Sequence, residues 1–318
     1  MSVPFEPLAS REPRESVKGQ WLCSLAMGLV GSTVVASQLI GQSVEPFLAT
    51  ALRHAAALPV FLLLMHRAGA RWPRVGWRDG VLLLLQAAAG SVGYMVLLIE
   101  GVRRCGAADA GIVAGTLPAV SALVSVLFLG ERPGWRLAVS VVLATGGVMV
   151  VAAAPGAADA AAPQRWLGIA LVLAAIGCEA LFILANKRLA NPVPALAMST
   201  LMSAGGLVLS AVPAALMIYT SPSVLDARAL GVIAYYAWVP TVGGFLLWYA
   251  GSARTSGTRA SLATAWLPVS ALLLSALWLG EPIRLAQWAG LGCVLLAVVL
   301  AAPSAKPPRR QRLDPHAA

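Results

Sequence analysis

Apolar residues follow one another in ten long runs along this chain, and short polar segments separate the runs. A window of about 19 residues places them at 21–40, 46–65, 79–99, 107–129, 136–154, 166–186, 195–218, 229–250, 259–279 and 285–302. A helix needs about 20 residues to cross the hydrocarbon core of a bilayer. The runs do not alternate apolar and polar residues, which excludes a membrane barrel. The pattern therefore predicts an all-α membrane protein with ten transmembrane helices.

Composition and charge narrow this interpretation further. The 318 residues are 59% hydrophobic and 11% charged, whereas about 25% of a soluble domain is charged. The short connections exclude a large catalytic domain outside the membrane. The net charge of +10 is spread over several connections rather than gathered in one patch, which favours membrane topology over nucleic-acid binding. The four cysteines have no CxxC spacing and no adjacent histidine, so they predict neither a metal site nor a disulfide framework.

The distribution of Lys and Arg predicts an orientation. With the N-terminus in the cytoplasm, cytoplasmic segments hold 17 of these residues and the opposite side holds 5, and Arg53 alone lies inside a run. This asymmetry places both termini in the cytoplasm by the positive-inside rule. We expect loops 66–78 and 187–194 inside and loops 155–165 and 219–228 outside. The segment 1–20 lacks a cleavable signal pattern, so we expect the first run to act as an uncleaved insertion signal.

The two halves of the sequence resemble each other. Residues 104–131 align without a gap with 254–281, and ten of the 28 positions are identical, including Pro118 with Pro268 and Glu131 with Glu281. Each half has five runs, an odd number, so the second half is expected to enter the membrane upside down. Inverted repeats of this kind underlie alternating access in transporters. We expect a disordered tail at 1–20, five-helix repeats at 21–155 and 156–302, and a basic tail at 303–318.

Several segments carry a resemblance to a known family. They are GLVGSTVVASQL and ALRHAAALPVFLLL near the start, LGERPGWRLAVSVVLATGGVMVVAA at the end of the first half, and ASLATAWLPVSALLLSALWLGEPIRLAQWAGLGCVLLAVVLA at the end of the second. Over about residues 21–302 the chain resembles the EamA-type members of the drug/metabolite transporter superfamily. The resemblance implies a bacterial inner-membrane transporter, typically an exporter of amino acids or other small metabolites. It also implies a central cavity lined by spans one to four and six to nine, with spans five and ten peripheral.

Breaks in the helical pattern at matching places in the two halves point to a binding region. In the same gapless register, Gly90 and Gly93 in the third run align with Pro240 and Gly243 in the eighth. These four residues are hinge candidates, together with Pro118 in the fourth run and Pro268 in the ninth. Proline removes a helical hydrogen bond and kinks a helix, and glycine allows close approach of another backbone. The same breaks could serve packing alone.

Polar side chains at membrane depth are costly, so each calls for a partner or a function. The candidate cavity residues are Arg53, Gln86, Tyr94, Glu179, Asn186, Trp238, Trp248 and Trp266. Gln86, Gly90, Gly93 and Tyr94 share one helical face. Arg53 opposite Glu179 would suit a zwitterion, although either could be a structural partner. His54 is expected to point about 100° away from Arg53 around the helix, so the two need not act together.

The remaining polar residues have simpler interpretations. Glu100 beside Arg103 and Arg104 is expected to form an ion cluster at the membrane surface. Glu131 and Glu281 are expected to make loop or cap contacts. Tyr235, Tyr236 and Tyr249 are expected to be interfacial anchors.

These features favour a secondary transporter over an enzyme. No GxxxxGK[ST] motif is present, so the drive is expected from a proton, an ion or the solute gradient. The alternatives are a proton-coupled exporter of cationic drugs and an intramembrane lipid-modifying enzyme, which would require clustered acids, histidines or metal ligands. We expect no cofactor and no metal. The expected partners are a small-molecule substrate, protons as a candidate coupling ion and membrane lipid, but no nucleic acid, and a homodimer stays open.

Overall fold

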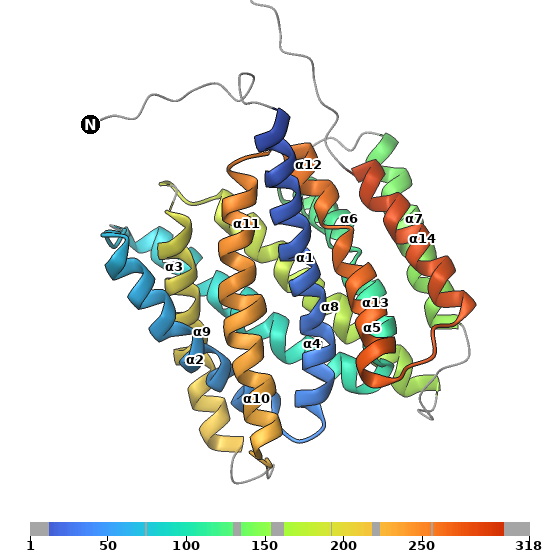
Figure 1. The fold of residues 1–318 in the computed structure, drawn as a ribbon, viewed down its shortest axis with the longest axis horizontal. Coiled ribbons are helices and arrows are strands. Elements are labelled where there is room, and N and C mark those ends of the chain that lie inside the picture. Colours follow the sequence, from blue (N-terminus) through green and yellow to red (C-terminus); the bar gives the residue numbers. More distant parts are fainter. Residues whose placement is uncertain are drawn as a thin grey trace, which may run out of the picture.

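A computed structural model of the chain describes residues 13–73, 75–129, 135–153, 162–191, 193–217, 223–255 and 257–301. These residues form a bundle of helices and connecting loops, with no strand among the described ranges (Figure 1). The elements of the first half are α1 (Pro13–Gly41), α2 (Pro46–Arg67), α3 (Trp77–Gln86), η2 (Ala87–Gly93), α4 (Tyr94–Cys105), α5 (Ala107–Ala114), α6 (Leu117–Leu129) and α7 (Trp135–Ala153). Those of the second half are α8 (Ala162–Lys187), α9 (Ala195–Met217), α10 (Ala227–Tyr236), η3 (Ala237–Gly243), α11 (Gly244–Ser252), α12 (Gly257–Ala263), α13 (Trp266–Leu279) and α14 (Leu285–Ala301).

Seven of the described helical segments are long and apolar enough to cross a membrane, or eight if α5 and α6 form one bent span. The predicted all-helical membrane fold is thereby confirmed. The last two apolar helices, α13 and α14, are shorter, and the 17 residues of α14 span about 25 Å. The hydrocarbon core is about 30 Å thick, so the count of ten spans stays a prediction.

The described elements of the first half recur in the second. In the gapless alignment of the halves, α10 begins and ends at the positions equivalent to the ends of α3, and η3 does the same for η2. Both η segments are π-helices. In a π-helix each backbone hydrogen bond joins residues five apart instead of four, and such turns occur often at functional sites. The irregular backbone predicted around Gly90–Gly93 and Pro240–Gly243 is therefore present in both halves.

Contacts between helices recur in the same way. Helix α4 packs on α8 as α11 packs on α1, and α2 and α7 pack on their own counterparts, α9 and α14. The close approaches are similar: a Cβ added to Gly101 would lie 2.9 Å from the carbonyl oxygen of Gly168, and one added to Gly251 would lie 2.7 Å from that of Gly19, one residue beyond the position equivalent to Gly168. Such distances require glycine at both contacts. The two halves are thus joined through equivalent pairs of helices.

The fourth and ninth runs are each divided into two helices. The break lies at 115–116 in the first half and at 264–265 in the second. Pro118 and Pro268 lie in the first turn of the helix after the break, where the missing N–H of proline needs no partner. The prolines therefore begin a new helix segment rather than kink a continuous one, and the axis between α5 and α6 bends by 41°.

Candidate functional site

A buried polar cluster lies where the two π-helical segments meet α2. Arg53 on α2 is only 8% exposed. Its Nη2 donates to the carbonyl of Ser91 (3.3 Å), and its Nη1 donates to Oγ1 of Thr241 (3.4 Å). Ser91 belongs to η2 and Thr241 to η3, and the two residues align with each other in the repeat. One guanidinium thus bridges equivalent positions of the two halves.

Aromatic and acidic side chains complete the surroundings of this guanidinium. Tyr236 is 2% exposed, which corrects its expected place as an interfacial anchor, and its ring lies 5.0 Å from the guanidinium carbon, as in a cation–π contact. Tyr94 and Glu179 lie close enough for electrostatic interaction with Arg53. In the described part of the chain, no hydrogen bond or ion pair joins Arg53 to Glu179. A solute could therefore bind both groups without first breaking a direct pair.

The structure corrects the expectation for His54. Its Nε2 lies 2.9 Å from Nη2 of Arg53 and 3.3 Å from the carbonyl oxygen of Ser91. The turn of about 100° between successive helical positions separates the Cβ atoms, but the long arginine side chain reaches back to the imidazole. If Nε2 carries the proton, His54 can donate to the carbonyl of Ser91. If Nδ1 carries it, Nε2 can accept from Arg53. The two side chains therefore lie within hydrogen-bond distance of each other in this structure.

Several buried polar side-chain atoms on α2 and at the end of α3 have no hydrogen-bond partner among the described residues. They include both amide atoms of Gln86, Nε of Arg53 and Nδ1 of His54. Gln86 is fully buried and is the first-half equivalent of Tyr236. Buried polar atoms are normally paired, and an unpaired one costs about 1–3 kcal/mol. These atoms therefore have capacity to bind water or a polar solute.

The structure does not bring every predicted cavity residue into this cluster. Asn186 is exposed near the end of α8. Trp238 is 54% exposed, and its Nε1 donates to the carbonyl of Ala56 (3.0 Å). Trp248 packs against a small cluster around Cys23, and Trp266 is half exposed. Arg53, Tyr94 and Glu179 are the predicted residues that lie together.

Four of the six hinge candidates lie in the π-helical segments that form this cluster. A Cβ on Gly90 would meet the ring of Phe182 at 2.8 Å, and one on Gly93 would lie 3.2 Å from Sγ of Cys178, both on α8. These glycines therefore let η2 approach α8 closely. Pro240 and Gly243 lie within η3.

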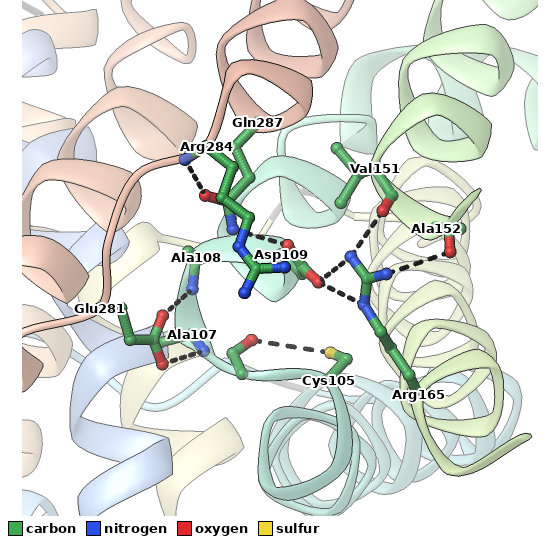
Figure 2. A network of polar contacts seen from close by, with 11 residues as sticks. Cys105, Ala107, Ala108, Asp109, Val151, Ala152, Arg165, Glu281, Arg284 and Gln287 are labelled. Atoms are coloured by element: carbon green, nitrogen blue, oxygen red, sulfur yellow. Dashed lines mark hydrogen bonds and ion pairs between the residues drawn. The ribbon is translucent and has the colours of Figure 1, made fainter. Parts of the chain in front are cut away.

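A second polar network, which sequence reasoning missed, surrounds Asp109 at the start of α5 (Figure 2). Arg165 donates from Nε (2.9 Å) and Nη2 (2.7 Å) to Oδ2 of Asp109. It also donates to the carbonyls of Val151 (2.6 Å) and Ala152 (3.2 Å) at the end of α7. Gln287 on α14 donates to Oδ1 of Asp109 at 2.8 Å. The network therefore ties α5 and α7 of the first half to α8 and α14 of the second.

Glu281 extends this network with a helix cap (Figure 2). Its carboxylate accepts from the backbone N–H groups of Ala107 (3.3 Å) and Ala108 (3.0 Å) at the N-terminus of α5. The cap contact predicted for Glu281 is confirmed, while Glu131 lies outside the described residues. Glu100 forms the predicted ion cluster with Arg103 (2.9 Å) and Arg104.

Comparison with known proteins identifies the family. The model of the EamA-like transporter family matches residues 17–153 and, a second time, residues 166–302. The chain belongs to the EamA-like transporter family. The two matches of this EamA-like transporter cover both sets of recurring helices and confirm the resemblance found in the sequence. It is accordingly a multi-pass membrane protein and a transporter.

Individual relatives agree with this assignment. The EamA-like chain is 31% identical over 287 residues to "Uncharacterized transporter YetK" of Bacillus subtilis, covering 89% of this chain and 86% of the relative. It is 30% identical over 215 residues to the "Probable terminal-alkyne amino-acid exporter" of Streptantibioticus cattleyicolor, covering 67% and 69%. A crystal structure at 21% identity superposes with a TM-score of 0.64 over 90% of this chain and 96% of the other. That last likeness concerns the fold alone.

Proposed function

We propose that this EamA-like protein is a secondary transporter of the bacterial inner membrane that exports amino acids or other small metabolites. Family membership supports transport, and the name of the Streptantibioticus relative, an amino-acid exporter, favours amino acids as the substrate class. In this proposal the chain crosses the membrane ten times as two inverted repeats, with both termini in the cytoplasm. The excess of Lys and Arg in the expected cytoplasmic segments supports this orientation.

One observation carries the proposed mechanism: Arg53 hydrogen bonds to Ser91 of η2 and Thr241 of η3, at equivalent positions of the two halves. In inverted-repeat transporters the solute binds between the repeats, next to irregular backbone. A solute bound at Arg53 would thus contact both halves at once. If the two halves exchanged conformations, the site would open first to one face of the membrane and then to the opposite face.

The charges of the cluster suit a zwitterionic solute. Arg53 presents guanidinium N–H groups that match a carboxylate, and Glu179 presents an oxygen acceptor for an ammonium group. Tyr94 and Tyr236 add apolar surface beside the two charges. Since a lone acid in a transport site can also bind a cation, Glu179 favours a proton-coupled exporter of cationic drugs as the second candidate.

A growth screen tests this proposal. A strain that overexpresses the chain is challenged with toxic amino-acid analogues, nucleosides and cationic drugs, beside the same strain expressing Arg53→Gln at equal membrane levels. We expect protection against amino-acid analogues by the wild type and loss of protection in the variant. Protection against cationic drugs alone would favour the second candidate. Equal sensitivity of all strains to every compound would contradict the proposal.

A further inference from the structure

A groove of about 300 Å³ runs between α1, α10 and α13, apart from the Arg53 cluster. Each helix contributes positions spaced three, four or seven residues apart, so each presents a continuous face to the groove. The faces include Ser32 and Leu39 on α1, Gly231 and Tyr235 on α10, and Leu274 and Trp278 on α13. The volume of the groove is at the lower end of the range for small-molecule sites.

The inner end of the groove has no polar atom in need of a partner. The hydroxyl of Tyr235 donates to Oγ of Ser32 (2.8 Å), and the Ser32 hydroxyl in turn donates to the carbonyl of Leu29 (2.6 Å). All other lining side chains from α1 and α13 are apolar or aromatic. An occupant therefore gains apolar contact here but no hydrogen bond, which suits a hydrocarbon chain.

The mouth of the groove carries an unpaired positive charge. Arg228, in the first turn of α10, lines the groove, is exposed and makes no hydrogen bond or ion pair in the described part of the chain. The nearest acid in sequence, Asp226, uses its carboxylate to cap α10 at the N–H of Ala229 (2.7 Å). Arg228 and Tyr235 are two helical turns apart, which corresponds to about 10 Å along the helix. An arginine at the mouth, followed by an apolar groove of this length, fits a phosphate group attached to a hydrocarbon chain.

We propose that this groove binds a phospholipid of the surrounding membrane, with the first part of an acyl chain between α1, α10 and α13 and the phosphodiester at Arg228. Guanidinium pairs with phosphate through two parallel hydrogen bonds. Trp278, which is 70% exposed, lies along the same groove, and tryptophan is favoured at the level of lipid headgroups. The bound lipid would fill the space between α1 of the first half and two helices of the second.

Gly231 offers a way to fill the groove without disturbing the fold. A Cβ added there meets nothing within 4 Å, although Gly231 lines the groove. The ring introduced by Gly231→Phe therefore enters the space that the acyl chain would occupy. Gly292 on α14 is a matched control, because it is exposed, equally open around its Cβ and outside the groove.

The test uses the full chain in phosphatidylcholine nanodiscs that contain a phosphatidylglycerol with a diazirine in its acyl chain. After illumination, peptide mapping is expected to locate the label on residues 32–39 and 231–235. Gly231→Phe should reduce labelling there severalfold and Arg228→Gln about fivefold, as expected for one basic side chain near a lipid surface, while Gly292→Phe leaves it unchanged. Size-exclusion profiles confirm that each variant stays folded.

Two results would overturn the proposal. The first is equal labelling of α14 and the groove, with no effect of Gly231→Phe, which would make the contact ordinary boundary lipid. The second is a homodimer that Gly231→Phe converts to a monomer, which would assign the groove to a second copy of the chain.

Discussion

Breaking the ion pair between Asp109 and Arg165 is expected to be far more costly than breaking a pair at the surface. The two residues are 3% and 8% exposed, and two hydrogen bonds of 2.9 and 2.7 Å join them. Removal of one partner from a buried pair leaves an uncompensated charge and costs about 3–5 kcal/mol. We therefore expect Asp109→Leu and Arg165→Met each to lower the free energy of unfolding by about this amount.

The double variant separates the charge effect from packing. Asp109→Leu with Arg165→Met leaves no buried charge, so it should be more stable than the sum of the single losses, with a coupling of up to about 3 kcal/mol. The carbonyls of Val151 and Ala152 still lose their donor, so full recovery is not expected. Unfolding is followed by circular dichroism against the mole fraction of SDS in mixed micelles.

Glu100→Gln serves as the matched control. The Glu100–Arg103 pair has side chains 26% and 44% exposed, and such pairs contribute less than about 1 kcal/mol. Single losses at Asp109 and Arg165 as small as this, or losses that simply add in the double variant, would show that this network does not stabilise the contact between the halves.

Further variants test other parts of the structure. Pro118→Ala combined with Pro268→Ala should insert normally but transport more slowly, because both prolines begin helices at a break; wild-type transport rates in liposomes would show that they serve packing alone. Glu179→Gln should lose gradient-driven accumulation while keeping exchange of substrate for substrate if this residue carries the coupling proton, and unchanged pH-dependent transport would leave it a structural role. Glu281→Ala should cost about 1 kcal/mol in SDS unfolding through loss of the α5 cap, and an unchanged midpoint would contradict that contact. A reporter fused at residue 72 should be active only in the cytoplasm, and activity outside would refute the inverted repeat.

The internal repeat made much of the fold predictable from the sequence. The gapless alignment of the halves pairs Gly90–Gly93 with Pro240–Gly243, and π-helical segments are found at both places. Proline and glycine mark such positions because they change the backbone itself, so the information is local. Hydropathy could not reveal that the fourth and ninth runs are each two helices, since both pieces are equally apolar.

The polar contacts were less predictable because they depend on residues far apart in sequence. Asp109 and Arg165 are separated by 56 positions, and hydropathy places Arg165 in a loop because the apolar window begins after it. The sequence did contain one indication. Asp109 and Arg165 each lie near the end of an apolar run, and both ends are expected on the same side of the membrane. Arg53, Tyr94 and Glu179 could be selected because charged and aromatic groups at membrane depth are rare, but contact between Arg53 and His54 depends on a side-chain conformation that helical spacing does not determine.

Transport by purified protein shows whether the chain carries amino acids and whether Arg53 binds them. The full chain and an Arg53→Lys variant are reconstituted into liposomes loaded with an unlabelled amino-acid mixture, and entry of each labelled amino acid by counterflow is measured. We expect saturable counterflow of at least one amino acid by the wild type. Affinity should be strongly reduced in Arg53→Lys, which keeps the charge but lacks the guanidinium fork that reaches Ser91 and Thr241. Counterflow at equal affinity in both proteins would contradict the placement of the substrate at Arg53, and no counterflow of any amino acid or small metabolite would contradict the proposed function.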